Sequence, residues 1–354
     1  HTRVRSTAAR KSQRAMTARQ LQSRRQSKQT SVKNQSERRI EMGAITAAMV
    51  KELRELTGAG MMDSKKALAA VEGDMEKAIE FLREKGLAGA QKKASRIAAE
   101  GMVAVLVSAD GKRGVAVEVN AETDFVAKNE KFRSYVDEVA AQALDTNATD
   151  LEAFLAEPWK ADNSLTVKEQ LSAMISVIGE KLDIRRFRQL KEENGFVESY
   201  VHAGGKIGVL LAVETDVVND AVKEMAKNIA MQVAALKPLY TSDAEVDADY
   251  LEKEREILAA QIKNDPKMAN KPEKVIEGAV QGRLQKELKE ICLLDQVYVK
   301  AEDGKQSVAA YVASVAKENQ ANIAIKTFVR YETGEGLEHK SENFAEEVAK
   351  QMQG

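Results

Sequence analysis

Apolar residues between positions 45 and 87 recur three or four places apart, in three separate runs. This spacing predicts three short amphipathic helices, because side chains three and four residues apart share one helix face. Thr46 is the expected N-cap of the first helix, whose apolar stripe would be Val50, Leu53 and Leu56.

Glycine and capping residues set the expected boundaries of these helices. The stretch 57–60, Thr-Gly-Ala-Gly, should end the first helix, and Asp63 should cap the second. The third helix would begin after Gly73-Asp74 and stop at Gly86. We assign residues 43–96 to this three-helix bundle, which resembles ubiquitin-associated domains.

A pattern of two apolar runs joined by a tight turn occurs twice, 94 positions apart. The first copy spans residues 101–119 and turns at Asp110-Gly111; the second spans residues 195–214 and turns at Gly204-Gly205. Asp-Gly and Gly-Gly are typical of tight β-hairpin turns, so each copy predicts a hairpin. Each copy then continues through a Thr-Asp pair into an amphipathic helix. The apolar stripes of these helices are Phe132, Tyr135, Val136 and Val139 in the first copy, and Val222, Met225, Ile229 and Val233 in the second.

The repeat predicts an α+β fold with two related subdomains. Later apolar runs near residues 183–190 and 322–331 could each add a third strand. We expect each subdomain to be a small antiparallel sheet with helices on one face. The expected limits are 97–184 for the first subdomain, and 185–240 together with 289–333 for the second.

A charged segment, residues 241–288, interrupts the second subdomain. Two helical stripes flank a gap that Pro266 and Pro272 bracket, which predicts an antiparallel helical hairpin of coiled-coil type. Its first arm of about 17 residues would reach about 25 Å. We interpret the hairpin as a docking device; the alternative is an ordinary part of the core.

The C-terminal segment, residues 334–354, is expected to end in an amphipathic helix. Its apolar stripe is Phe344, Val348 and Met352. A helix this short is unstable alone, so we expect it to dock on this chain or on a partner.

Charge is distributed unevenly along the chain. Residues 1–41 hold 12 of the 54 Lys and Arg residues and only two acids, which leaves 42 basic against 53 acidic residues in the remainder. We expect this basic extension to be disordered, because it has few large apolar residues. Three interpretations are open: an organelle transit peptide, an RNA-binding arm, or upstream sequence before a native start at Met42, which we favour. The acidic body argues against nucleic acid as the main partner.

The residues needed for catalysis or metal binding are sparse. The three histidines, His1, His202 and His339, lie far apart, and no Cys/His cluster has metal-ligand spacing. Cys292 is the single cysteine, so no internal disulfide can form, and we expect it to pack as a small hydrophobic residue. We therefore expect neither an enzyme nor a cofactor or metal. No run of 18 apolar residues predicts a membrane span.

Several motifs, in order along residues 42–354, resemble the elongation factor Ts family of translation. They are ITAAMVKELRELTGAGMMDSKKAL at 45–68, AETDFVAKN at 121–129, HAGGKIGVL at 202–210, ICLLDQ at 291–296 and YETGEG at 331–336. The resemblance implies a guanine-nucleotide exchange factor that expels GDP from elongation factor Tu. It also implies a bacterial cytoplasmic protein, with no direct contact to nucleotide, membrane or DNA, and with RNA met only indirectly or through the basic extension.

The resemblance implies a first set of partner contacts at Thr123, Asp124, Phe125 and Val126. Asp124 and Phe125 would form a wedge that enters elongation factor Tu near its Mg²⁺ site. The alternative is that Asp124 caps a helix while Phe125 fills the local core. The second copy keeps Thr-Asp but has Val217 at the position of Phe125, so the fold itself does not require the ring.

Further contacts are implied at Arg54, Met61, Met62 and Lys65, on the nucleotide domain of elongation factor Tu, and at His202, on a second domain. Adjacent methionines cannot easily both face one small core, and flexible Met suits a binding surface. The alternatives are that one Met is buried and that His202 is a solvated turn residue. Two rival functions are a ubiquitin-associated-like adaptor for another protein, and RNA binding through the basic extension.

Overall fold

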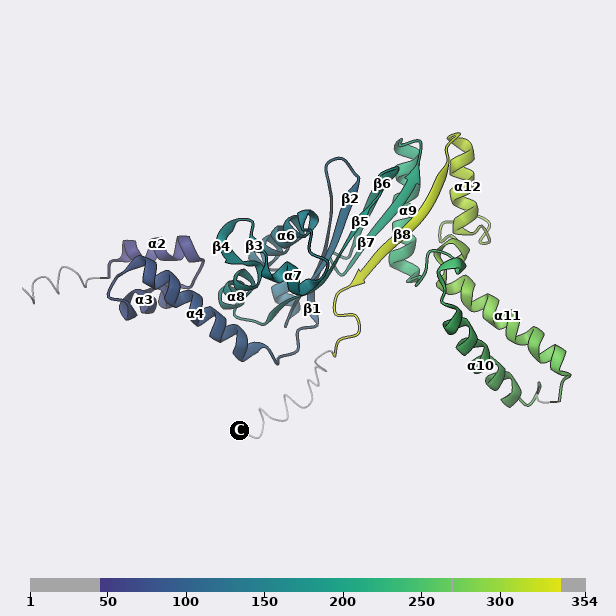
Figure 1. The fold of residues 1–354 in the computed structure, drawn as a ribbon, viewed down its shortest axis with the longest axis horizontal. Coiled ribbons are helices and arrows are strands. Elements are labelled where there is room, and N and C mark those ends of the chain that lie inside the picture. Colours follow the sequence, from purple (N-terminus) through teal and green to yellow (C-terminus); the bar gives the residue numbers. More distant parts are fainter. Residues whose placement is uncertain (1–44, 269, 339–354) are drawn as a thin grey trace, which may run out of the picture. The chain divides into compact units, whose positions relative to one another are not determined.

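The computed structural model describes residues 45–268 and 270–338 (Figure 1). They belong to two units, divided between Gly89 and Ala90. The predicted basic extension and the predicted C-terminal stripe of Phe344, Val348 and Met352 lie outside the described residues. The α+β class, with small antiparallel sheets, is confirmed, while the finer domain limits stay predictions.

The first unit is built from helices α2 (Ala47–Thr57), α3 (Met61–Ala70) and the main part of α4 (Met75–Lys93). Thr46 caps α2 as predicted, since its hydroxyl oxygen accepts a hydrogen bond from the Met49 N–H. Gly58 ends α2 in a left-handed conformation that favours glycine. The core of this first unit consists of Val50, Leu53, Ala67, Leu68 and Ala78.

Three details of this unit differ from the sequence-based prediction. Asp63 is not a cap: α3 already begins at Met61 after an extended Gly60, and Asp63 pairs with Lys85 at 2.6 Å. Gly86 does not end α4, which continues to Lys93. It is a buried residue within the helix, where the lack of a side chain permits close packing. Leu56 is exposed. The position on the same helix face as Val50, about two turns later, is Thr57 and not Leu56.

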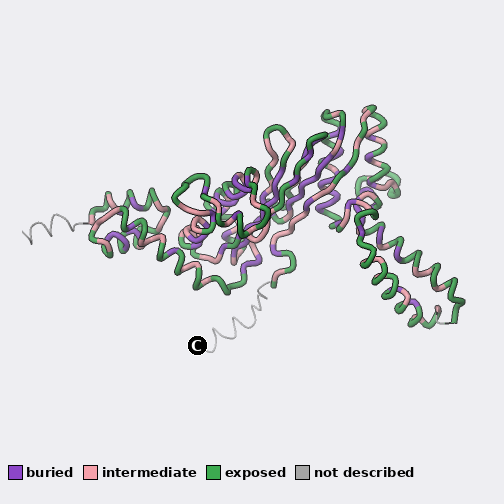
Figure 2. Tube along the Cα trace, viewed as in Figure 1, coloured by how far each residue is buried: buried purple, intermediate pink, exposed green. Residues whose placement is uncertain are grey.

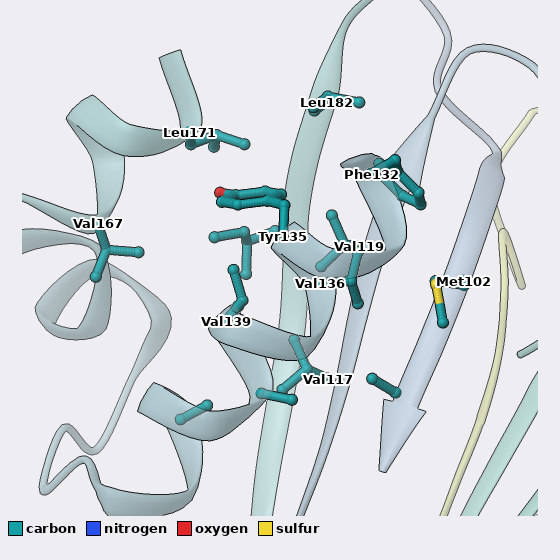
Figure 3. Packing of buried hydrophobic residues seen from close by; sticks show 14 of the residues in the cluster. Met102, Val117, Val119, Phe132, Tyr135, Val136, Val139, Val167, Leu171 and Leu182 are labelled. Carbon is teal, nitrogen blue, oxygen red and sulfur yellow. The ribbon is translucent and has the colours of Figure 1, made fainter. Parts of the chain in front are cut away.

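The first sheet of the second unit has the strand order β1-β2-β5 and is antiparallel throughout. Its strands are β1 (Glu100–Val107), β2 (Arg113–Ala121) and β5 (Leu182–Lys191). Helices α6 (Glu130–Asp145), α7 (Leu151–Ala156) and α8 (Val167–Ile178) and the ribbon β3 (Pro158–Trp159) and β4 (Asp162–Thr166) accompany it. Figure 3 shows the predicted stripe of α6 packed against Val117, Val119 and Leu182.

The second sheet repeats this arrangement in the order β6-β7-β8. Its elements are β6 (Gly195–His202), β7 (Ile207–Thr215), helix α9 (Asp220–Leu236), helix α12 (Val308–Glu318) and β8 (Ile323–Glu332). The predicted stripe of α9 is fully buried. Both sheets even have a register shift at the same place in the repeat, after Glu118 in β2 and after Ala212 in β7.

The predicted helical hairpin consists of α10 (Ala248–Asn264) and α11 (Glu273–Ile291). Leu258, Ile262, Leu284 and Leu288 are buried between or beside the arms. At the base of the hairpin, the N–H groups of Leu239 and Tyr240 donate to the Ile291 carbonyl. Short 3₁₀ turns, η1 (Asp243–Glu245) and η2 (Leu293–Asp295), flank the arms.

The two sheets pack face to face, because their central strands, β2 and β7, are buried on both sides. In β2, Val115, Val117 and Val119 face the α6 core, whereas Ala116 faces the other sheet. The core between the two sheets consists of Ala116, Leu190, Val197, Leu210, Ala212 and Val329. Figure 2 shows this region of the strands as buried. Each sheet thus has helices on its outer face and the other sheet on its inner face.

The hairpin turns bond reciprocally to the opposite sheets. The Val103 N–H donates to the Gly205 carbonyl at 2.7 Å, and the Val197 N–H donates to the Gly111 carbonyl at 2.8 Å. These two bonds join equivalent positions of the 94-residue repeat. Glycine permits the close approach: a Cβ at Gly208 would lie 2.5 Å from Val103 Cγ1.

Gly208→Ala should lower the free energy of unfolding by about 1–3 kcal/mol, because the new methyl group overpacks against the stiff side chain of Val103. Urea unfolding followed by the fluorescence of Trp159, the single tryptophan, measures this change. The matched control is Gly278→Ala in α11, where a Cβ meets no atom within 4 Å; it should gain about 0.5–1 kcal/mol. Unchanged stability of Gly208→Ala would contradict the close approach.

Cys292 should resist alkylation in the folded chain. It is buried at the base of the helical hairpin, and burial raises the pKa of its thiol to about 11, with Asp295 adding to the shift. Little thiolate is therefore present at pH 8, and the thiolate is the nucleophile. Iodoacetamide labelling followed by mass spectrometry should modify Cys292 only after denaturation; rapid labelling of the native chain would contradict this burial.

Candidate protein-binding site

The Thr-Asp-Phe-Val motif folds into a single helical turn, α5 (Asp124–Ala127), directly after β2. Thr123 holds its start: the Thr123 N–H and hydroxyl both donate to the Glu180 carboxylate, at 3.1 and 2.9 Å. The Thr123 hydroxyl oxygen also accepts from the Val126 N–H. Val126 packs into the core between the first sheet and α6. Thr123 and Val126 therefore anchor α5 to the sheet and core.

Phe125 is 79% exposed, the largest fraction for any large apolar side chain in the described ranges. On a helical turn, neighbouring residues point about 100° apart, so the inward position of Val126 directs Phe125 outward. The sequence left open that Phe125 fills the local core and that Asp124 caps a helix. The exposed ring and the cap at Thr123 exclude both alternatives.

Asp124 is exposed beside Phe125 and pairs with Lys128, one helical turn later, at 2.7 Å. The hydrogen bond from Lys128 lowers the pKa of Asp124 below its usual value, and the charge of Lys206 lowers it further. Asp124 is therefore ionised at neutral pH.

Arg133, in the first turns of α6, joins α5 to the turn of the second hairpin. Its Nε donates to the Ala127 carbonyl and its Nη2 donates to the Gly204 carbonyl, both at 3.0 Å. The structure thereby brings Phe125 and the His202 turn into one region of the second unit. We did not single out Arg133 from the sequence, because no local pattern signals a bond to a residue 71 positions away.

His202 ends β6 and is exposed. Its Nδ1 lies 3.1 Å from the Tyr200 hydroxyl. The following turn has left-handed backbone at Ala203, Gly204 and Gly205, which explains the two glycines.

A shallow polar groove runs along α6 beside α5. It is lined by Lys128, Glu130, Arg133, Ser134 and Asp137. Charged walls and an open form suit a protein surface better than a small apolar ligand.

In the first unit, the predicted residues Arg54, Met61, Met62 and Lys65 are all exposed. Met61 and Met62 are 59% and 61% exposed, so the alternative that one of them is buried is wrong. Leu56, predicted above to face the core, is 62% exposed and adds an apolar side chain to this surface. Strict helical spacing from Val50 places Leu56 off the core-facing side, so the pattern itself could have predicted its exposure.

Within residues 45–268 and 270–338, no group of three or more His, Cys, Asp or Glu side chains is placed so that it could hold a metal ion. In the same part of the chain, no helix combines the length and the apolar character that a membrane crossing needs.

Comparison with known proteins supports the resemblance seen in the motifs. The family model described as Elongation factor TS matches residues 122–335. Elongation factor Ts of Clostridium novyi (strain NT) is 51% identical over 308 residues, which cover 87% of this chain and 99% of the relative. Elongation factor Ts of Clostridium tetani (strain Massachusetts / E88) is 50% identical over 309 residues, which cover 87% of this chain and all of the relative. The chain therefore belongs to the elongation factor Ts family, the nucleotide-exchange factors of translation elongation.

Proposed function

We propose that this chain releases GDP from elongation factor Tu by inserting Phe125 beside the Mg²⁺ and phosphates of the bound nucleotide. The observation that carries the proposal is a large aromatic ring, 79% exposed, on a helical turn whose neighbours Thr123 and Val126 are anchored. We place this exchange in the bacterial cytoplasm, since the relatives come from bacteria.

Insertion of the ring supplies binding energy at the point of insertion. Burying an exposed Phe side chain is worth about 1.5–3 kcal/mol, and aromatic anchors are common hot spots of interfaces. Mg²⁺ requires near-ideal octahedral geometry, so a displacement of the surrounding backbone by about an ångström should cost several kcal/mol of nucleotide affinity. By linkage, GDP weakens the binding of this chain to elongation factor Tu by the same factor.

Asp124 contributes charge to the same event. Its carboxylate is ionised, and near the phosphates it would weaken their binding through like-charge repulsion. Lys128 pairs with Asp124 in the free chain and keeps the side chain in place.

The other exposed residues hold the two proteins together. Met61, Met62 and Leu56 are exposed apolar side chains that suit a contact with the nucleotide domain of elongation factor Tu, and the exposed charges of Arg54 and Lys65 add polar contacts. The His202 turn provides a contact with a second domain of the partner. Affinity thus comes from several surfaces, and the exchange step depends on Phe125 and Asp124.

The double variant Asp124→Ala/Phe125→Ala should slow GDP release at saturating exchange factor by about 30-fold, since a hot-spot truncation costs about 2 kcal/mol. Release of fluorescent GDP from purified elongation factor Tu measures the rate. The control is Val218→Ala, which truncates a 51% exposed apolar side chain at the corresponding segment of the second repeat and should keep the full rate. Release at the wild-type rate by the double variant would refute the wedge.

The double variant Arg54→Ala/Met62→Ala should weaken binding to elongation factor Tu by about 10–100-fold, because it removes a charge and an exposed apolar contact. The rate at saturation should stay near wild type, since the wedge is intact. Titration calorimetry gives the affinity, with Lys77→Ala, 70% exposed on α4, as the control. Equal affinities for the double variant and the wild type would exclude this surface.

A further inference from the structure

The helical turn that carries Phe125 has little stability of its own. It is four residues long, and its first backbone bond, from the Ala127 N–H to the Thr123 carbonyl, measures 3.4 Å. A single turn is the unfavourable nucleus of a helix and does not persist without outside support. Thr123 and Glu180 hold the start of α5. At its end, the Lys128 and Asn129 N–H groups donate to the Phe125 and Val126 carbonyls, and a side chain supports the last carbonyl, that of Ala127.

Arg133 supplies that support at the end of α5. Its guanidinium donates to the Ala127 carbonyl and, from a second nitrogen, to the Gly204 carbonyl. Hydrogen bonds from a charged donor are stronger than neutral ones, and the planar fork fixes both directions at once.

The turn on the far side of this bridge is itself well fixed. The Gly205 carbonyl accepts from the Val103 N–H and from the Thr333 hydroxyl, and the Lys206 carbonyl accepts from the Thr333 N–H. Arg133 thus connects α5 to a turn that both sheets hold in place.

We propose that Arg133 is a positioning residue for nucleotide exchange: it locks the Phe125-bearing turn to the turn that carries His202. The inference rests on the proposed function, in which Phe125 is the wedge. The bridge keeps the ring at a constant distance from the second contact, so that docking of the His202 turn drives the ring inward. Without the bridge, α5 yields and the ring is misplaced by about the ångström that matters for a positioned group.

The second repeat provides a matched comparison. Lys223 follows the N-cap Asn219 of α9 by four residues, as Arg133 follows the N-cap Asn129 of α6. Lys223 is exposed, and the second repeat has no helical turn corresponding to α5 between β7 and α9.

The first test compares GDP release from elongation factor Tu by Arg133→Ala, Arg133→Lys and Lys223→Ala. Arg133→Ala should lower the maximal rate by about tenfold while the concentration of factor for half-maximal rate changes less than about twofold. Arg133→Lys keeps the charge but loses the planar fork, so it should stay slow; Lys223→Ala should match the wild type. Recovery of the full rate by Arg133→Lys would mean that the charge acts directly on the partner, and would overturn the inference.

The second test separates positioning from direct contact. Because Arg133 acts through the ring, the double variant Arg133→Ala/Phe125→Ala should be no slower than Phe125→Ala alone. In the free chain, Arg133→Ala should speed amide hydrogen exchange at residues 124–127 about tenfold or more, while exchange in the α6 core stays unchanged.

The outcomes distinguish the inference from the proposed function. If Phe125→Ala keeps the wild-type rate, the proposed function fails and the inference falls with it. If Phe125→Ala is slow while Arg133→Ala keeps the full rate, or leaves exchange at residues 124–127 unchanged, the proposed function stands and the inference is overturned.

Discussion

The reciprocal contact between the two hairpins is the interaction on which the other features of the second unit depend. Each turn accepts a backbone N–H from the opposite sheet, at Gly205 and at Gly111, and the glycines at 114 and 208 let the strands approach. This contact places the turn after His202 next to the end of β2, where α5 begins. Arg133 can then reach both α5 and that turn. The position of Phe125 is thus a consequence of how the two sheets face each other.

The two repeats share a frame and differ where the first copy carries the binding residues. Phe125 and Arg133 of the first copy correspond to Val217 and Lys223 of the second. Glu118 corresponds to Ala212, and its fully buried carboxylate accepts from Arg185, Arg186 and the Gly334 N–H. A buried carboxylate is stable only when such partners surround it. These bonds connect the segment after β8 to the first sheet. The residues that differ between the two repeats therefore include both proposed binding residues and a residue that holds the two sheets together.

Local patterns were sufficient to predict most elements of the fold, but not helices α7, α8 and α12, the β3–β4 ribbon or the association of the two sheets. The 94-residue repeat, the apolar stripes of α6 and α9, and the Pro-bracketed hairpin predicted the α+β class and, in each half, a strand pair followed by a helix. The face-to-face packing was not predicted, although the apolar character of both faces of β7 was a signal for it. In the candidate site, exposure of Phe125 and of both methionines followed from no periodicity. Arg133 and its bond to Gly204 depend on tertiary contact between segments 71 residues apart.

The proposed exchange mechanism requires that the ring at position 125 enters the partner beside its Mg²⁺ and phosphate site. The most direct measurement replaces Phe125 with a photo-crosslinking phenylalanine, irradiates the complex with nucleotide-free elongation factor Tu, and maps the adduct by mass spectrometry. If the ring enters at that site, the adduct forms on the partner peptides that border the Mg²⁺ and the phosphates. An adduct on a remote surface of the partner, or within this chain itself, would contradict it.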